Sequence, residues 1–222
     1  MKLLRSVCFV AASLLVVRSV FAQGFQNLDF ESTTVLQAQP AGQVSVTNAL
    51  PGWAAGAPPF TYLPSVGFNN AVSNGVYYTG VFLLGTNSGS VIEGGFSVLL
   101  QVAAPGTILA VSIYQPSLVP VGSQSLLFKA QPGLGSLELF LGGQSIPFFA
   151  ESKGPNYTLY AGDVSAFAGQ TVYLAFTAFQ GSPVNSWILD SIQFSSSPIP
   201  EPSALSFLGI LAFFLHCRMR RR

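Results

Sequence analysis

The sequence predicts an all-β fold for residues 23–197, in the form of an antiparallel sandwich or barrel. Short apolar or alternating runs recur along this body of the chain, which is typical of half-buried strands. Pairs such as Pro105-Gly106 and Pro132-Gly133 separate the runs and favour turns. The body shows no helical period over a useful length. Many short strands at this spacing indicate packed sheets.

Seven segments are predicted strands because of their apolar content and the turn residues that bound them. Leu174, Phe176 and Ala178 alternate with other residues, which predicts that they share the buried face of one strand. Trp187 alternates with polar neighbours and is predicted to lie in the core. The seven predicted strands are residues 97–102, 108–115, 125–130, 137–141, 156–163, 171–179 and 186–194.

Two regions of the body have weaker strand signals. Residues 32–95 are rich in Pro, Gly and Asn, and we expect them to combine short strands with long loops on one rim of the sandwich. Residues 163–169 predict one short helical turn, with Asp163 as its N-cap and Gly169 as its stop. The triplet at 156–158 fits a glycosylation acceptor, and we interpret it as ordinary sequence at the start of a strand.

Charge and residue usage exclude several function classes. Between residues 23 and 200 the chain has two lysines and seven carboxylates, hence a formal charge of −5. Nucleic acid is excluded as a partner, because its binding depends on clustered Lys and Arg. The body has no Cys and no His, which excludes a Ser-His-Asp or Cys-His centre and a His-based zinc site. We expect no enzymatic activity; a carboxylate pair that hydrolyses glycosides is the alternative.

The N-terminus has the features of a secretory signal peptide, residues 1–22. Basic residues precede an apolar run over residues 6–17, and the small residues before Gln23 fit cleavage after Ala22. The run is too short to span a membrane comfortably, and an N-terminal anchor is the alternative. The signal predicts export through the Sec machinery.

The C-terminus has three parts in a fixed order. Residues 198–202 contain three prolines, an apolar run follows over residues 204–217, and four arginines lie in the last five positions. A stable spanning helix needs about 20 residues, but the basic cluster favours a short transmembrane helix with its end in the cytoplasm. The residues concerned are Pro200, Glu201 and Pro202 in the motif, and Arg218, Arg220, Arg221 and Arg222 in the tail.

This tail, residues 198–222, resembles the PEP-CTERM sorting signal of Gram-negative bacteria. The resemblance implies recognition by exosortase, a membrane-embedded cysteine protease that processes chains near the Pro-Glu-Pro motif. It also implies a precursor held transiently in the inner membrane and a mature protein at the cell surface or in the extracellular matrix. The body is similar to uncharacterised PEP-CTERM proteins of Verrucomicrobia-like bacteria, which share stretches such as LPGW, QSLLFKA and LDSIQFS.

The two ends of the body resemble the first and last strands of galactose-binding-like jelly-roll domains of the carbohydrate-binding-module type. FQNLDFES (25–32) matches the opening pattern through Phe30 and Glu31, and WILDSIQF (187–194) matches the closing pattern through Asp190. The resemblance implies a jelly-roll-type antiparallel β-sandwich in which Glu31 and Asp190 are neighbours. It implies that both are candidate ligands of a structural Ca²⁺, which prefers oxygen donors; two solvated acids at a sheet end are the alternative. No other cofactor is expected.

Aromatic side chains in the loop-rich half are the candidate ligand-binding residues. They are Trp53, Tyr77 and Tyr78, and Asn69 and Asn70 lie close to the tyrosines in the sequence. Exposed rings stack on sugars, but core packing is the alternative for each ring. We therefore expect a structural or adhesive component of an exopolysaccharide-associated envelope, with extracellular polysaccharide as a partner. A carbohydrate-binding module is the first alternative, and a carboxylate-based glycoside hydrolase has less support.

Overall fold

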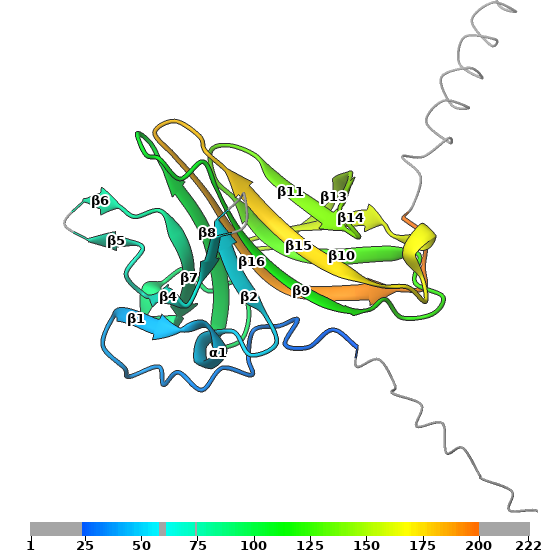
Figure 1. Ribbon diagram of the computed structural model, residues 1–222, viewed down its shortest axis with the longest axis horizontal. Helices are drawn as coiled ribbons and strands as arrows, with labels where there is room; N and C mark the ends of the chain where they lie inside the picture. The colour runs from blue at the N-terminus through cyan, green and yellow to red at the C-terminus, as the bar shows by residue number, and fades with distance from the viewer. Residues whose placement is uncertain (1–23, 58–60, 74, 200–222) are drawn as a thin grey trace, which may run out of the picture.

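The computed structural model describes residues 24–57, 61–73 and 75–199, and it shows an all-β, jelly-roll-type antiparallel sandwich (Figure 1). The predicted fold class is confirmed. The elements in chain order are β1 (Gly42–Ser45), α1 (Val46–Ala49), β2 (Ala54–Ala57), β3 (Thr61–Leu63), β4 (Ser65–Phe68), β5 (Val72–Ser73), β6 (Val76–Tyr77), β7 (Gly80–Gly85), η1 (Thr86–Ser88), β8 (Phe96–Ala103), β9 (Ala110–Leu118), β10 (Ser125–Pro132), β11 (Leu137–Leu141), β12 (Gln144–Ile146), β13 (Phe148–Lys153), β14 (Thr158–Asp163), η2 (Ser165–Phe167), β15 (Thr171–Phe179) and β16 (Val184–Ser195).

Two sheets form the layers of the sandwich. The larger sheet has the order β1-β4-β7-β8-β16-β10-β14-β13, and the smaller has the order β12-β11-β15-β9-β2-β3. The strands β5 and β6 form a separate hairpin. Neighbouring strands pair antiparallel, except that β4 and β7 pair in parallel through Gly67–Phe82 and Phe68–Leu83. The longest strands thus lie inside the sheets, where both edges are paired.

All seven predicted strands are present. The strands β11 and β15 have the predicted bounds, and the other five differ by a few residues at their ends. Leu174, Phe176 and Ala178 of β15 are fully buried, as the alternation predicts. Trp187 is also buried, within the same core. The period-2 pattern therefore identifies both the strands and their inward faces.

A 3₁₀ turn, η2, stands where the sequence predicts a helical turn. Asp163 lies one position before the N-cap, Val164, and its Oδ1 accepts a hydrogen bond from Ser165 N at 2.9 Å. This bond holds the pKa of the Asp163 carboxyl below its usual value. Gly169 follows the turn with a φ of 76°, a conformation that favours glycine. The place and the end of the turn are as predicted, but its N-cap is not.

Residues 25–32 are not a strand, which corrects the expectation drawn from the jelly-roll resemblance. The backbone turns at Asn27 and Phe30, whose φ angles are 49° and 59°, outside the extended region. The segment does lie beside the last strand, because Phe25 stacks on Phe194 with ring centroids 5.1 Å apart. The neighbourhood is as predicted, whereas the secondary structure is not.

Residues 32–95 contribute short strands to both layers, at one end of each sheet, with loops between them. The strands β1, β4 and β7 complete one end of the larger sheet, and β2 and β3 complete one end of the smaller sheet. The short strands expected there are present. Two strands were missed: β12, which pairs with β11 across a turn formed by Gly142 and Gly143 with positive φ angles, and β13, which pairs with β14 in the larger sheet.

Phe128 joins the two layers. Its side chain is fully buried and comes from β10 of the larger sheet. Its ring centroid lies 5.1 Å from that of Phe176 in β15 of the smaller sheet, 5.2 Å from Phe148 and 5.4 Å from Tyr160. Such aromatic pairs bury large areas in specific geometries. This cluster is therefore a main source of stability between the sheets.

Both ends of the described chain lie at one end of the sandwich, and the β5–β6 hairpin lies at the opposite end (Figure 1). Gly24 forms a bridge with Leu118, and Ser197 O accepts a hydrogen bond from Ser125 Oγ at 2.8 Å. The predicted signal peptide, the Pro-Glu-Pro motif, the apolar run 204–217 and the arginine tail all lie outside the described residues. Within the described part of the chain, no helix is long and apolar enough to cross a membrane.

Candidate functional site: a groove on the larger sheet

A groove with a volume of about 480 Å³ crosses the outer face of the larger sheet. Alternation places Leu99 and Gln101 of β8 on this face, and it does the same for Ser186 and Ile188 of β16, while their neighbours enter the core. The described lining contains amides, hydroxyls and apolar groups and no charged side chain. The other polar lining residues are Asn69, Asn87, Ser88, Ser90 and Gln131.

The β5–β6 hairpin borders one side of the groove. Gln101 is almost fully buried, and its Nε2 donates to Ala71 O at 2.9 Å and to Tyr78 O at 2.8 Å. One side chain on the sheet thus bonds to the backbone at both ends of the hairpin. The buried amide is satisfied by these bonds, as buried polar groups generally are. The hairpin is therefore fixed at its base.

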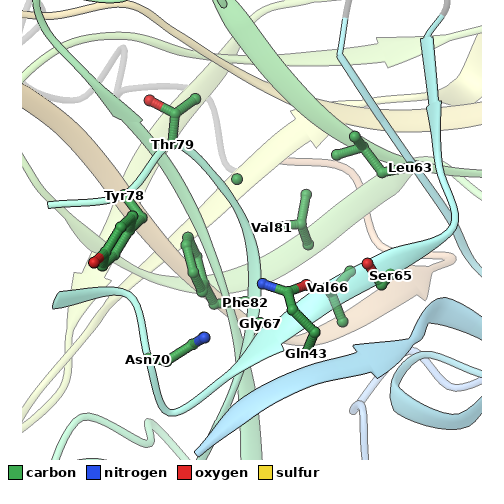
Figure 2. A pocket seen from close by; sticks show the side chains of 11 residues that line it. Gln43, Leu63, Ser65, Val66, Gly67, Asn70, Tyr78, Thr79, Val81 and Phe82 are labelled. Atoms are coloured by element: carbon green, nitrogen blue, oxygen red, sulfur yellow. The ribbon is translucent and has the colours of Figure 1, made fainter. Parts of the chain in front are cut away.

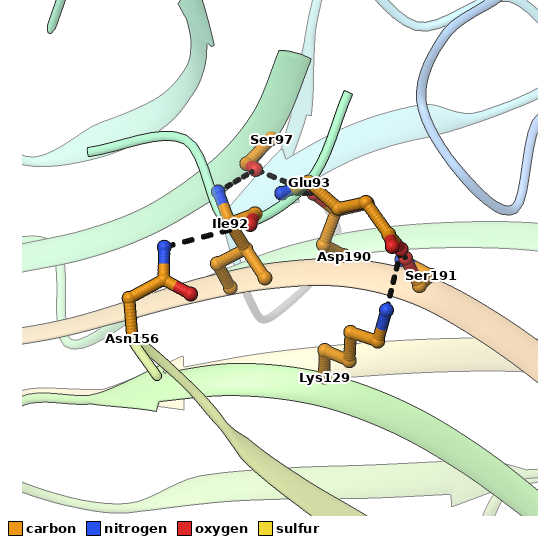
Figure 3. A network of polar contacts seen from close by, with 7 residues as sticks. All are labelled: Ile92, Glu93, Ser97, Lys129, Asn156, Asp190 and Ser191. Atoms are coloured by element: carbon orange, nitrogen blue, oxygen red, sulfur yellow. Dashed lines mark hydrogen bonds and ion pairs between the residues drawn. The ribbon is translucent and has the colours of Figure 1, made fainter. Parts of the chain in front are cut away.

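The loop between η1 and β8 borders the other side, and a buried carboxylate fixes it (Figure 3). Asp190 of β16 is 1% exposed. Its Oδ2 accepts hydrogen bonds from Ser97 Oγ at 2.6 Å and from Glu93 N at 3.2 Å. Ser97 Oγ in turn accepts from Ile92 N at 2.9 Å. These bonds connect the loop backbone to the face of the sheet.

Burial raises the pKa of the Asp190 carboxyl to about 6, against an ordinary value of 3.8. Desolvation is the largest cause, and the negative charge of Glu31 adds to it. The hydrogen bonds from Ser97, Ser191 and Glu93 act in the opposite direction, because they stabilise the ionised form. Near neutral pH the loop is therefore anchored on an ionised carboxylate that has little contact with water.

Three further side chains hold the loop from its outer side. Glu93 accepts hydrogen bonds from Lys129 Nζ and from Ser191 Oγ. The bond with Lys129 is the largest cause that lowers the pKa of Glu93 and raises the pKa of Lys129. Asn156 Nδ2 donates to Val91 O at 3.2 Å, so the amide of the predicted acceptor triplet points at the loop backbone. The loop is thus held from three strands of the larger sheet and from the turn before β14.

The structure brings Glu31 and Asp190 to the same segment, residues 93–97, as the jelly-roll resemblance implies. Glu31 Oε1 accepts from Gly95 N at 2.8 Å and from Phe96 N at 3.0 Å. Both carboxylates thus face N–H donors, whereas a bound Ca²⁺ needs its ligands' oxygen atoms turned towards the ion. Among the described residues, no group of three or more His, Cys, Asp or Glu side chains could hold a metal. The calcium site stays a prediction, and in this arrangement the two acids anchor the segment.

The predicted aromatic residues separate into two groups. Trp53 is 5% exposed, packs beside Phe30 and donates from its Nε1 to Asn27 O at 2.9 Å. Its assignment to a ligand-binding surface is therefore corrected: it belongs to the core. Tyr77 and Tyr78 are about half exposed, at 50% and 48%, and they lie at the end of the hairpin that borders the groove. Only these two remain candidates for ligand contact.

Sequence reasoning missed the polar residues on the floor and walls of the groove. Gln101 interrupts an apolar run in β8, and Ser186 follows Asn185 near the start of β16. Such polar residues at outward positions of a strand usually face solvent. The available signal was the Gln101 amide within the otherwise apolar stretch from Val98 to Val102. Gln131 gave no such signal, because it lies at the end of β10, next to turn residues.

No family model and no curated protein matches this chain. A cyclase from Fischerella sp. TAU is 15% identical over 81% of this chain and 98% of its own length, with a TM-score of 0.47. The carbohydrate-binding module TmCBM61, solved with beta-1,4-galactotriose, is 9% identical over 78% and 98%, with a TM-score of 0.39. The K1 adhesin domain of Lys-gingipain from Porphyromonas gingivalis W83 is 13% identical over 76% and 96%, with a TM-score of 0.33. These values assign neither a family nor a function.

Proposed function

We propose that this chain is an exported surface or matrix protein whose sandwich binds neutral polysaccharide in the groove. One observation carries the proposal: the described lining combines amides and hydroxyls with an apolar floor and includes no charged residue. Amides both donate and accept hydrogen bonds, as sugar hydroxyls do. The apolar floor at Leu99 and Ile188 offers a surface for the C–H face of a sugar ring. Because the described lining contains no acid, the proposal assigns no catalytic role to the groove.

The charge of the lining selects among polymers. An anionic polysaccharide would need Arg or Lys, which form the strong bonds to carboxylates and sulfates, and the described lining has neither. A neutral chain loses no ionic hydration when it enters the groove. The position of the hairpin agrees with this role. It lies opposite the end at which the described chain begins and ends (Figure 1), so a tether beyond residue 199 would leave the hairpin pointing outward.

We also propose that the tail directs the protein to its place. The exported precursor is held in the inner membrane by residues 204–217, is processed by exosortase near Pro200–Pro202, and is delivered to the surface or matrix as a structural or adhesive component. The order of the three parts of the tail supports this sorting, and the signal-like N-terminus supports export. Both rest on the sequence.

Gln131→Ala tests the groove, because this side chain lines it and no hydrogen bond of its amide is among those described. We expect the dissociation constant for a neutral polysaccharide to rise roughly tenfold, the effect of losing one or two well-placed hydrogen bonds. Affinity electrophoresis of the full chain in gels that contain neutral or anionic polysaccharides measures it. Gln39→Ala, an exposed amide outside the groove, is the matched control. Preference for anionic polymers, or equal binding by both variants, contradicts the proposal.

The sorting step has its own test. The full chain is expressed in hosts with and without exosortase, and the intact mass and membrane fraction of the product are measured. We expect loss of the tail near Pro200–Pro202 and release from the inner membrane only when exosortase is present. An uncut chain that stays in the membrane of both hosts contradicts sorting and leaves residues 204–217 as a plain anchor.

A further inference from the structure

A second cavity lies in the larger sheet, where β4 and β7 separate (Figure 2). The two strands pair only through Gly67–Phe82 and Phe68–Leu83, and the chain before these pairs diverges. The opening holds a pocket of about 320 Å³, lined by Gln43, Leu63, residues 65–67, Asn70 and residues 78–82. This volume is at the small end of ligand pockets, which span about 300–1,000 Å³.

Three polar side chains in this pocket have unused hydrogen-bonding capacity. The Oδ1 atom of Asn70 is buried and has no partner among the described residues. No hydrogen bond of the Gln43 amide or the Ser65 hydroxyl is found within the same part of the chain. Buried polar atoms are paired in most native structures. Within the described residues, the pocket therefore has an unpaired amide oxygen packed at its floor and two polar side chains, Gln43 and Ser65, that are available to a ligand.

Gly67 makes the arrangement possible. A Cβ atom at this position would lie 2.2 Å from Asn70 Oδ1 and 2.3 Å from Cδ1 of the Phe82 ring. Both distances are far below van der Waals contact. Only glycine therefore lets the amide and the ring approach the floor of the pocket. The floor of the pocket therefore depends on glycine at this position.

The remaining surface is apolar and aromatic. Val66, Val81 and Phe82 form apolar walls, the half-exposed ring of Tyr78 stands at the rim, and the described lining carries no charged residue. We propose that the pocket binds one neutral sugar ring: its hydroxyls pair with the amides and the hydroxyl, and its C–H face packs on the aromatic rim. This site is distinct from the groove. Asn69 and Ala71 line the groove, whereas Asn70 between them lines the pocket.

A sugar ring can be a free monosaccharide or the terminal unit of a glycan, and the test separates the two. Saturation-transfer NMR and calorimetry of the full chain, held in a detergent without a sugar headgroup, use a panel of neutral hexoses and their methyl glycosides. We expect at least one hexose to bind with a millimolar dissociation constant. If the methyl glycoside binds as tightly as the free hexose, the natural ligand is the terminal unit of a glycan. If methylation abolishes binding, the natural ligand is a free sugar. Both results support the site.

Variants locate the binding. Gln43→Ala should weaken binding of the hexose roughly tenfold, and Gly67→Ala should abolish it by displacing Asn70 and Phe82. Because Gly67→Ala also strains the sheet, thermal unfolding of each variant is compared with that of the parent chain, and Gln43→Ala decides if Gly67→Ala does not fold. Gln131→Ala, the groove variant, should leave hexose binding within about twofold.

The outcomes keep the two proposals apart. Hexose binding that falls in Gln43→Ala but not in Gln131→Ala supports the pocket even if polysaccharide binding by the groove fails. The pocket proposal is overturned if no hexose binds at a concentration 50-fold above the millimolar range. It is also overturned if Gln43→Ala binds the hexose as tightly as the parent chain does. Neither of these results changes the polysaccharide measurement on which the groove depends.

Discussion

Replacing Phe128 with alanine should lower the free energy of unfolding by about 3–5 kcal/mol, the range for a buried Phe whose cavity cannot fully collapse. Phe128 is fully buried and contacts three aromatic rings with centroid separations of 5.1 to 5.4 Å. These rings belong to both sheets, so the cavity would open between the layers. Urea denaturation at fixed pH, followed by tryptophan fluorescence, measures the loss.

Phe149→Ala is the matched control. Phe149 lies in the edge strand β13 and is 64% exposed, so its removal should cost about 0.5 kcal/mol or less. The difference between the two variants tests whether the aromatic cluster joins the sheets. Similar losses for both variants, or a loss below about 1 kcal/mol for Phe128→Ala, would contradict the packing described for the core.

Lowering the pH from 7.5 to 4.5 should raise the free energy of unfolding by about 2 kcal/mol. The cause is Asp190, whose pKa is about 6 in the fold and 3.8 ordinarily. Between these values the folded protein holds a proton that the unfolded chain has released, so stability falls as pH rises. The contribution is complete below the unfolded pKa and is lost above the folded one. Denaturation midpoints at several pH values measure it.

Asp190→Asn separates this carboxyl from the other acids. Asparagine keeps the shape of the side chain but does not titrate, so stability should become nearly flat between pH 7.5 and 4.5. The lowered pKa values of Glu93 and Asp163 act in the opposite direction, with effects confined to lower pH. An unchanged slope in Asp190→Asn, or a parent chain that loses stability on acidification to pH 4.5, would contradict the burial of this carboxylate.

The central strands could be predicted because hydrophobic burial imposes a period of two on the sequence. Residues 137–141 and 171–179 alternate or run apolar between glycines, and β11 and β15 occupy these ranges. Segments with weaker burial gave no comparable pattern. β13 is an edge strand whose last five residues are exposed, and residues 25–32 follow the sheet through turns with positive φ angles rather than by alternation.

The groove could not be predicted, because it depends on pairing between distant strands. Gln101, Ser186 and Gln131 share one surface only after β8, β16 and β10 lie side by side. The proximity of Glu31 to Asp190 was predictable, but only through the jelly-roll resemblance. Which aromatic residues are exposed could not be predicted, because exposure depends on the packing of the fold. Trp53 fits a sugar-stacking role in sequence, yet its ring packs on Phe30 in the core.

Titration of the full chain with a bound neutral polysaccharide, followed by NMR of side-chain amide groups, tests the central claim most directly. We predict that the signals of Gln131 and Asn87, which line the groove, shift with ligand concentration. The signal of Gln115, whose buried amide bonds to Gln26 O at 3.0 Å, should not move. Shifts confined to residues outside the groove, or no shifts at saturating polysaccharide, would contradict the assignment of the groove as the polysaccharide site.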